Sequence, residues 1–375
     1  MAGIYIHIPF CKQACHYCNF HFSTSLKYKN EMLASILHEF DLRKNYLSSK
    51  KIDSVYFGGG TPSLLEAAEI EQILSKITSI YTLADDAEIT LEANPDDLTE
   101  KKLKDLQQTA INRLSIGIQS FIQADLSLMN RAHDTNQAIN CVEMAHKMGF
   151  HNLSIDLIYG TPTLSNEAWK MNLKRAFEFD ITHISAYCLT VEEKTALAHF
   201  VKVGKVPAVD EEKAAEQFEI LVSETTKNGY EHYEISNFCK PNFRAKHNSS
   251  YWLGKEYIGI GPSAHSFCGT SRQWNVANNA AYMKDIKNDI LPAEIEELSI
   301  KERFNEYIMT SLRTNWGCNL EKVARDFGEN YVNYLKKETR IFLQEKLMKN
   351  EKEVLILTTK GKFIADGIIS DLFMV

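Results

Sequence analysis

The stretch Cys11-Lys12-Gln13-Ala14-Cys15-His16-Tyr17-Cys18 is the most distinctive feature of the chain. Its three cysteines stand four and three residues apart, and the apolar run 4–9 leads directly into them. Thiolates are preferred ligands of iron–sulfur clusters and of zinc. Because a closed structural site takes four protein ligands, three cysteines predict a metal centre with one position left for another ligand.

The composition is that of a soluble globular protein. The 375 residues are 44% hydrophobic and 24% charged, and this length accommodates about two domains. With 42 basic and 49 acidic residues the formal net charge is −7, which argues against nucleic acid as the main partner. The sequence has no basic-then-apolar leader and no apolar run near the roughly 18 residues of a membrane span, so we expect a cytoplasmic protein.

Short apolar runs alternate with amphipathic segments through the first half of the chain. Each run is bounded by turn residues, as buried parallel strands are. Successive βα units predict a parallel sheet with right-handed crossovers, and periodicity alone leaves both an open doubly wound sheet and an incomplete barrel as solutions. The predicted strands are 4–9, 52–58, 88–94, 113–120, 153–159 and 183–190, and the predicted helices between them are 28–46, 67–80, 99–108, 135–148 and 166–179.

The pattern changes after residue 190. A helical pattern at 210–227 is followed by β-like pieces at 230–238 and 257–260 and by glycine-rich, aromatic loops. The end of the chain reads as a compact, mostly helical module of winged-helix type, and its many acidic residues argue against DNA binding. Its predicted elements are helices at 300–312, 320–327, 331–347 and 363–372 and a strand at 354–357.

Unusual residues gather where the predicted strands end. The cysteines follow the first strand, Gly58-Gly59-Gly60-Thr61-Pro62 ends the second, and Glu92 lies near the end of the third. Gln119 ends the fourth strand and Asp156 lies within the fifth. Both candidate folds place their chemistry at the carboxyl ends of parallel strands. These residues are therefore expected to share one site.

The cysteine spacing C-x3-C-x2-C after a first strand, with the aromatic Tyr17 before the last cysteine, resembles the radical S-adenosylmethionine (SAM) superfamily. The resemblance implies a [4Fe–4S] cluster held by Cys11, Cys15 and Cys18, with the fourth iron chelated by the amino and carboxylate groups of SAM. One electron from the cluster would cleave SAM to a 5′-deoxyadenosyl radical. A zinc site, for which His7 or His16 could supply the further ligand, is the alternative.

The same resemblance assigns a SAM site around these strand ends. The glycine-rich stretch 58–62 is similar to the motif whose backbone carbonyls meet the SAM amino group, because glycine allows close backbone approach. For Glu92 and Asp156 taken singly, a strand-end cap or a salt bridge remains the alternative. The positions that the resemblance implies for SAM are Tyr5, Tyr17, Gly59, Gly60, Thr61, Glu92, Gln119, Arg131 and Asp156.

A narrower resemblance covers nearly the whole chain. The segments YIHIPFC, FGGGTPS, LEANPD and IDLIYGTP are similar to the oxygen-independent coproporphyrinogen III oxidases (HemN) and to the related haem chaperone family (HemW). The oxidases carry a fourth cysteine where this chain has Phe20, and a longer segment before the first strand, which starts here at Gly3. The hexapeptide His247-Asn248-Ser249-Ser250-Tyr251-Trp252 matches the HNxxYW pattern of the chaperones. These departures favour the chaperone family.

The hexapeptide predicts a haem-binding loop. Histidine is a common axial ligand of haem iron, so His247 is the candidate ligand, and Tyr251 and Trp252 offer flat apolar faces to a porphyrin. The alternative is a loop whose histidine satisfies a backbone carbonyl while its aromatic residues fill the core. Cys188 and His265 are further candidates for the wall of the same cavity.

These observations combine into one expectation. The fold class is α/β: residues 1–230 form an incomplete (β/α)6 TIM-type barrel, 231–298 form an extension with antiparallel strands and the haem-binding loop, and 299–375 form the winged-helix-like module. The protein is expected to be a haem chaperone that binds the cluster, SAM and haem and delivers haem to an acceptor such as a respiratory haem protein.

The alternative activity is oxidative decarboxylation of coproporphyrinogen III. The sequence does not decide whether SAM is cleaved, and no catalytic residue is assigned. We expect no nucleic-acid partner. A transient association with a membrane surface and a homodimer are both left open.

Overall fold

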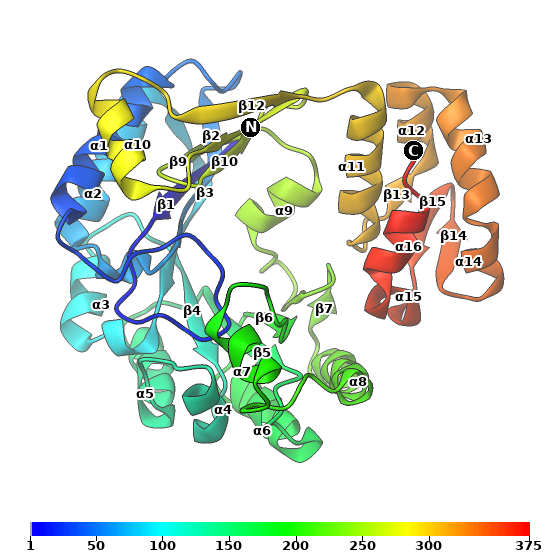
Figure 1. Cartoon of the computed structure of the whole chain (residues 1–375), viewed down its shortest axis with the longest axis horizontal. Coiled ribbons are helices and arrows are strands. Elements are labelled where there is room, and N and C mark those ends of the chain that lie inside the picture. The colour runs from blue at the N-terminus through cyan, green and yellow to red at the C-terminus, as the bar shows by residue number, and fades with distance from the viewer. Residues whose placement is uncertain (1) are drawn as a thin grey trace.

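A computed structural model describes residues 2–375; Met1, the first residue of the predicted 1–230 unit, lies outside the described residues. A twelve-stranded mixed sheet forms the centre of the molecule (Figure 1). Its parallel strands follow chain order across the middle of the sheet. They are β1 (Ala2–Ile8), β2 (Lys51–Gly59), β3 (Thr82–Ala93), β4 (Arg113–Gln119), β5 (Leu153–Tyr159) and β6 (His183–Cys188).

The strand order decides between the two topologies that the sequence left open. Neighbours in the chain are neighbours in the sheet from β1 to β6. A doubly wound sheet instead reverses its strand order at a switch point. The sequential order is that of a sheet wound in one direction, as in (β/α) barrels.

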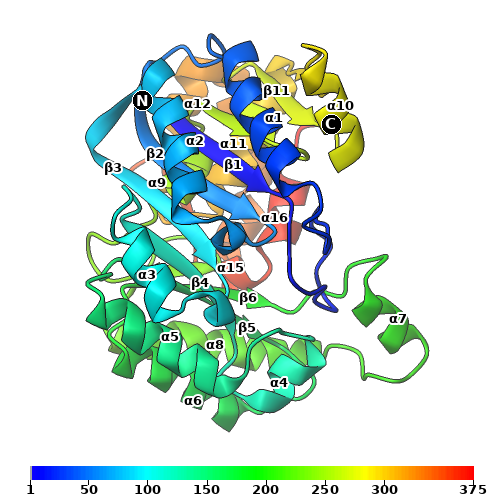
Figure 2. The same ribbon diagram turned by 90° about the vertical axis from the view of Figure 1, so that its left-hand side faces the viewer.

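A helix follows each of the first five strands and packs on the outer face of the sheet (Figure 2). The predicted strands and helices of this half are confirmed, with most ends shifted by a few residues and β3 starting six residues earlier than expected. The helices are α1 (Lys29–Leu42), α2 (Ala67–Ile80), α3 (Glu100–Leu106), α5 (Thr135–Lys147) and α6 (Asn166–Glu178), with the additional short α4 (Gln123–Leu128). Short 3₁₀ turns, η1 (Pro62–Leu64) and η2 (Pro95–Asp97), follow β2 and β3.

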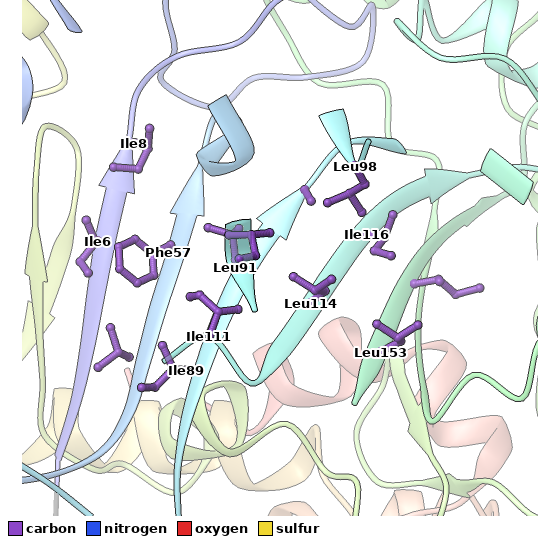
Figure 3. Close-up of a cluster of buried hydrophobic side chains, with 14 of the residues drawn as sticks. Ile6, Ile8, Phe57, Ile89, Leu91, Leu98, Ile111, Leu114, Ile116 and Leu153 are labelled. Atoms are coloured by element: carbon purple, nitrogen blue, oxygen red, sulfur yellow. The ribbon is translucent and has the colours of Figure 1, made fainter. Parts of the chain in front are cut away.

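The two faces of the sheet differ in chemistry because side chains alternate along each strand. Ile6, Phe57, Leu91 and Leu114 are fully buried and come from four neighbouring strands (Figure 3). They belong to one large apolar cluster with residues of the covering helices. The opposite face carries polar residues at the intervening positions, and this face holds the candidate site.

Further strands extend the sheet at both ends. Beyond β6 lie β8 (Asn237–Cys239) and β7 (Glu231–His232), both antiparallel. On the other side β9 (Tyr257–Ile260) pairs parallel with β1, and β10 (His265–Phe267), β11 (Ser271–Asn275) and β12 (Ala293–Glu297) continue antiparallel. The helices of this part are α7 (Ala196–Lys202), α8 (Glu211–Lys227) and α10 (Asn279–Lys287).

The hexapeptide is not a loop, which corrects the prediction. Residues Lys246–Trp252 form helix α9. The carboxylate of Glu88 on β3 accepts hydrogen bonds of 3.0 Å from the backbone amides of both Lys246 and His247. A carboxylate at a helix start satisfies amides that otherwise have no partner. Because this cap comes from far away in the chain, the local sequence gives no sign of it.

A buried charged pair fixes α1 to the extended edge of the sheet. Nη1 of Arg43 donates to Glu39 Oε1 at 3.1 Å and to the carbonyl of Gly259 at 2.8 Å. Glu39 in turn accepts from the hydroxyl of Tyr282 at 2.6 Å. Nη2 of Arg43 donates to Gln273 on β11. This network therefore connects α1 to strands β9 and β11.

The last part of the chain packs around a hydrophobic cluster of its own, which includes Phe304, Ile308, Leu335 and Ile368. The predicted helix 331–347 is interrupted at Thr339, whose hydroxyl donates to the carbonyl of Leu335. The elements are α11 (Ile300–Leu312), β13 (Cys318–Asn319), α12 (Leu320–Phe327), α13 (Glu329–Glu338), α14 (Arg340–Gln344), β14 (Met348–Glu351), β15 (Val354–Leu357), α15 (Thr359–Phe363) and α16 (Ala365–Asp371). Three short strands form a small antiparallel sheet in the order β13-β15-β14. Within residues 2–375, no helix has the length and apolar character needed to cross a membrane.

Candidate functional site

The cysteine stretch lies on the long loop between β1 and α1 and is fastened to the segment after β4. Nε2 of Gln13 donates to the carbonyl of Asn130 at 2.9 Å, and Nδ2 of Asn130 donates to the carbonyl of Ala14 at 2.8 Å. Nδ1 of His16 is hydrogen-bonded to the carbonyl of Leu128 at 2.8 Å. The loop is therefore shaped by distant residues even though it carries little regular structure.

The three cysteines are free thiols, each partly exposed. Burial raises the pKa of Cys11 to about 11, and the neighbouring Cys18 and Cys15 contribute in the same direction. The three thiols are thus close enough to interact. Among residues 2–375 no three His, Cys, Asp or Glu side chains converge as ligands of a single ion. A four-iron cluster takes its cysteines at separate corners, so this donor set fits a cluster better than a preformed zinc site.

Arg131 connects the cysteine loop to the ends of the strands. Its Nη1 donates to Sγ of Cys15 at 3.3 Å, and its Nη2 donates to Asn94 Oδ1 at 2.7 Å and to the carbonyl of Gly117 at 2.9 Å. Its charge lowers the pKa of the Cys11 and Cys18 thiols against the larger, opposing effect of burial. A fixed positive charge beside the thiols favours the thiolate form that binds metal.

The glycines after β2 allow the strand end to pack against the cysteine loop. A Cβ on Gly60 would lie 2.5 Å from the carbonyl oxygen of Phe10, closer than such atoms approach. Gly59 adopts a φ of 108°, a conformation that L side chains rarely adopt. The hydroxyl of the buried Thr61 accepts a hydrogen bond from Nδ2 of Asn94 at 3.2 Å, and Thr61 acts to lower the pKa of the Cys11 thiol. The glycine-rich motif therefore packs directly against the cysteine loop.

Two carboxyl groups on the polar face of the sheet have pKa values near neutrality. Burial raises the pKa of Glu92 to about 7, with the charge of Asp156 adding to the effect. Burial likewise raises the pKa of Asp156 to about 6. The hydroxyl of Tyr56 donates to Glu92 Oε1 at 2.7 Å. The negative charge of Asp156 thus disfavours ionisation of Glu92, and a bound cation would favour ionisation of both carboxyl groups.

Gln119 and Tyr17 complete this group. Gln119 has a φ of 65° at the end of β4. A Cβ on Gly117 would meet Gln119 Nε2 at 3.0 Å and Arg131 Nη2 at 3.2 Å, so both side chains converge on this glycine. Burial raises the pKa of Tyr17. The charge of Arg131 lowers this pKa and the charge of Asp156 raises it further. The structure therefore brings the polar positions predicted for SAM together with the cysteines.

Tyr5 lies at the other side of this group and begins an aromatic stack. Its ring centroid is 6.1 Å from that of Tyr56 and 6.4 Å from that of His247, and the last two rings stack at 5.1 Å. The hydroxyl of Tyr5 is hydrogen-bonded to Nδ1 of His7 at 3.2 Å. Tyr56 is a member of the site that the sequence analysis did not name, and His7 was considered there only as a possible zinc ligand, although both residues occupy inward positions of their strands.

His247 is a buried histidine with both ring nitrogens engaged. It is 1% exposed, Nδ1 is hydrogen-bonded to Ser54 Oγ at 2.9 Å, and Nε2 is hydrogen-bonded to the Tyr251 hydroxyl at 2.7 Å. Burial lowers its pKa to about 3. Ligation of haem by His247 stays a prediction, and it requires one of these hydrogen bonds to break.

A cavity of about 740 Å³, which we call the aromatic cavity, opens beside Tyr5. Its lining residues come from strands β9–β11, from helices α11 and α12 and from the end of α9. Figure 1 shows where these elements lie. Its volume is within the range of small-molecule and cofactor sites. The floor includes Tyr257, His265, Phe267 and Arg272, the roof includes Arg303, Glu306, Tyr307, Lys322 and Phe327, and the ends include Tyr5, Phe20, His21, Tyr251 and Trp252.

Some of the residues predicted to contact haem line the aromatic cavity, and others do not. Tyr251, Trp252 and His265 line it, as expected. Cys188 is absent from its wall and lies beside Gly160 instead, where a Cβ would be 3.1 Å from its sulfur. None of the roof residues was predicted individually, because they come from a part of the chain with no local motif.

Comparisons with known proteins agree with this geometry. Residues 5–176 match the model of the radical SAM superfamily. The chain is 33% identical to "Heme chaperone HemW" of Lactococcus lactis, covering 97% of each chain, and 30% identical to "Heme chaperone HemW" of Bacillus subtilis, covering 98% of each.

The fold matches that of coproporphyrinogen III oxidase (HemN) of Escherichia coli, described as a radical SAM enzyme. The TM-score is 0.86 at 21% identity, and the match covers 100% of this chain and 90% of that one. This likeness shows a shared α/β fold. Full-length identity of 30% and 33% to the two relatives named above shows the family as well. The chain belongs to the HemW family of the radical SAM superfamily.

Proposed function

We propose that this protein is a haem chaperone that binds haem in the aromatic cavity and passes it to an acceptor protein. The observation that carries the proposal is the cavity itself. The aromatic residues Tyr251, Trp252, Tyr257 and Tyr307 all line this one cavity. Aromatic faces with polar edges suit a flat, largely apolar ring system. The names of the full-length relatives support the same reading.

The charged side chains of the cavity suit the two propionates of haem. Arg272 on the floor and Arg303 and Lys322 on the roof all line it. Arg272 Nη2 lies 2.8 Å from Glu306 Oε1, so this ion pair joins the floor to the roof. A guanidinium matches the planar, two-oxygen geometry of a carboxylate. An entering propionate would compete with Glu306 for Arg272.

In this proposal Cys11, Cys15 and Cys18 hold a [4Fe–4S] cluster, and SAM lies over the strand ends. When bound, the cluster supplies one-electron reduction at a potential set by its surroundings. Arg131 keeps a positive charge at Cys15. The residues proposed to surround SAM are Tyr5, Tyr17, Gly59, Gly60, Thr61, Glu92, Gln119, Arg131 and Asp156.

The chain's own groups suit a cationic ligand at this place. Glu92 and Asp156 share the polar interior, and each has a pKa raised by burial. An incoming ammonium or sulfonium group lowers the cost of ionising them. The Tyr56 hydroxyl already orients one oxygen of Glu92. These carboxylates would bind and orient SAM, and no chemical step is assigned to them.

Haem titration tests the proposal directly. The purified protein, reconstituted anaerobically, is expected to develop a saturable Soret band with ferric haem and to lose it when an apo haem protein is added as acceptor. Trp252→Ala is expected to weaken haem binding about tenfold. Tyr28→Ala, an exposed aromatic outside the cavity, serves as the matched control. Saturable binding that Trp252→Ala and Tyr307→Ala both leave unchanged would place haem elsewhere.

A second candidate function is oxidation of a porphyrinogen. The observation that favours it is Tyr5, which belongs both to the proposed SAM surroundings and to the cavity wall. A porphyrinogen in the cavity would therefore adjoin SAM. Anaerobic incubation with coproporphyrinogen III, SAM and a reductant tests this. Formation of protoporphyrinogen with 5′-deoxyadenosine would replace the chaperone proposal, whereas haem transfer without turnover supports it.

A further inference from the structure

We infer that His265, rather than His247, supplies the axial ligand to haem iron in the aromatic cavity, and that Arg303 binds a haem propionate. This inference rests on the proposed function, because it names the ligands within that site. It follows from which side chains in the wall still have unused hydrogen-bonding atoms.

The histidines around the cavity differ in the state of their ring nitrogens. His7 is hydrogen-bonded to the hydroxyl of Tyr5 and to the carbonyl of His21. His21 itself is hydrogen-bonded through Nε2 to Asn279 Oδ1 at 2.7 Å. Both nitrogens of His247 are engaged, as described above.

His265 differs from all of these. Its side chain is exposed and lines the cavity. Neither of its ring nitrogens has a hydrogen-bond partner within residues 2–375. Iron coordination needs a free lone pair on a neutral imidazole. Because no existing hydrogen bond has to break, His265 reaches this state at lower cost than His247.

The strand holds the imidazole on the cavity side. Side chains alternate along β10, so His265 and Phe267 face the cavity while Ser266 faces away and donates to the carbonyl of Gly259 behind the sheet. His265 is paired across the strands with Trp274, and the two rings stack with centroids 6.1 Å apart. Partial desolvation in the cavity wall, together with the charge of Arg272, also lowers the pKa of His265, which favours the neutral ring. A ligand on a paired strand is held more firmly than one on a loop.

Arg303 provides the second, independent observation. Arg303 lines the cavity from α11, whereas His265 lines it from β10. It has no ion-pair partner among the residues that the structure describes, and its Nε is buried without a hydrogen-bond acceptor. Arg272 and Lys322, by contrast, are already paired with Glu306 and Asp326. An unpaired guanidinium in a cavity wall points to an anionic group of the ligand.

The histidine assignment is tested by ferric haem titration of the full-length protein with three matched variants, His265→Ala, His247→Ala and His21→Ala. We expect His265→Ala to weaken binding at least tenfold and to shift the Soret band and the electron paramagnetic resonance signal to those of haem without protein imidazole. Free imidazole should restore the wild-type spectrum. His265→Tyr should replace it with a tyrosinate-type spectrum. His247→Ala and His21→Ala should keep the wild-type band position.

Esterification tests the propionate contact separately. Arg303→Gln should weaken haem binding about fivefold or more and leave binding of haem dimethyl ester unchanged. A wild-type spectrum in His265→Ala, or its loss in His247→Ala or His21→Ala with restoration by imidazole, would overturn the assignment of His265. Equal losses for haem and its ester in Arg303→Gln would overturn the propionate contact. Absence of any haem binding by the wild-type protein would instead overturn the proposed function, and this inference with it.

Discussion

The guanidinium of Arg131 donates through Nη1 to the sulfur of Cys15 at 3.3 Å. This contact joins the segment after β4 to the loop after β1, so the charge reaches the thiols from a distant part of the chain. The same side chain also holds Asn94 and the carbonyl of Gly117. One residue therefore both shapes the cysteine loop and sets its electrostatics.

Replacing Arg131 should make the cluster-free thiols less reactive. Arg131→Gln removes a charge that lowers the pKa of Cys11 and Cys18, so less thiolate is present at neutral pH. We expect carbamidomethylation of these cysteines by iodoacetamide to slow by about 2- to 10-fold. Arg131→Lys keeps the charge and should retain much of the rate, and the exposed Arg325→Gln is the control. An unchanged rate in Arg131→Gln would show that the charge does not act on the thiols.

Iron content should separate the three loop cysteines from the others. Cys11→Ala, Cys15→Ala and Cys18→Ala each remove a proposed ligand, and each variant should lose most of the iron and the visible absorbance after anaerobic reconstitution. Cys188→Ala and Cys268→Ala should reconstitute like the wild type. Circular dichroism checks that the variants remain folded. Full iron incorporation in any one of the loop variants would exclude that residue as a ligand.

Gly60 and Gly367 offer a matched pair for the close packing under the cysteines. Gly60→Ala forces a Cβ to within 2.5 Å of the Phe10 carbonyl oxygen, whereas nothing lies within 4 Å of a Cβ on Gly367 in α16. We expect Gly60→Ala to reduce the free energy of unfolding by about 1–3 kcal/mol. Gly367→Ala should raise it by about 0.5–1 kcal/mol. Chemical denaturation measures both, and equal effects would mean that Gly60 is not tightly packed.

Removing one partner of the buried pair Glu39–Arg43 should reduce the free energy of unfolding far more than removing one partner of a surface pair. Arg43→Met leaves Glu39 buried without its cationic partner, which costs about 3–5 kcal/mol in the free energy of unfolding. The double variant Glu39→Gln/Arg43→Met should recover part of this loss, because no unpaired charge remains. Lys101→Ala removes an exposed pair with Asp105 and should cost under about 1 kcal/mol. A double variant that is less stable than Arg43→Met would contradict this account.

Glu92→Gln should change how stability depends on pH. The folded-state pKa of Glu92, about 7, lies above its ordinary value of 4.5. The folded state therefore holds this proton more tightly, and the wild type loses the associated stability as the pH rises from about 4.5 through 7. Gln cannot ionise, so the stability of the variant relative to the wild type should increase by about 2–3 kcal/mol between pH 5 and pH 8. Denaturation of the cluster-free proteins at both pH values measures this gain, and a constant difference would contradict it.

The sequence predicted the central sheet well because its strands carry strong local signals. Long apolar runs bounded by turns located β5 and α2 to the residue. The alternation in Tyr5-Ile6-His7-Ile8 also held unused information, because its inward positions mark the polar face of the site. Strand order could not follow from periodicity, since it depends on which strands pair.

Parts of the site depend on contacts between distant residues, and these the sequence could not supply. Helix α9 starts at Lys246 because Glu88, on another strand, caps it. The hexapeptide motif drew attention to His247, but a motif does not reveal that Ser54 and Tyr251 occupy both of its nitrogens. The roof of the cavity appears only when α11 and α12 are placed over the sheet edge.

The aromatic cavity has a further consequence because its floor and roof are built on separate apolar clusters. The ion pair between Arg272 and Glu306 connects these two separately packed parts of the protein. If the proposed haem binds between them, separation of the two parts would release it without unfolding of either apolar cluster. An acceptor protein that displaced one part from the other would then promote haem release. The free energy of separating the two parts would set the dissociation rate of the haem.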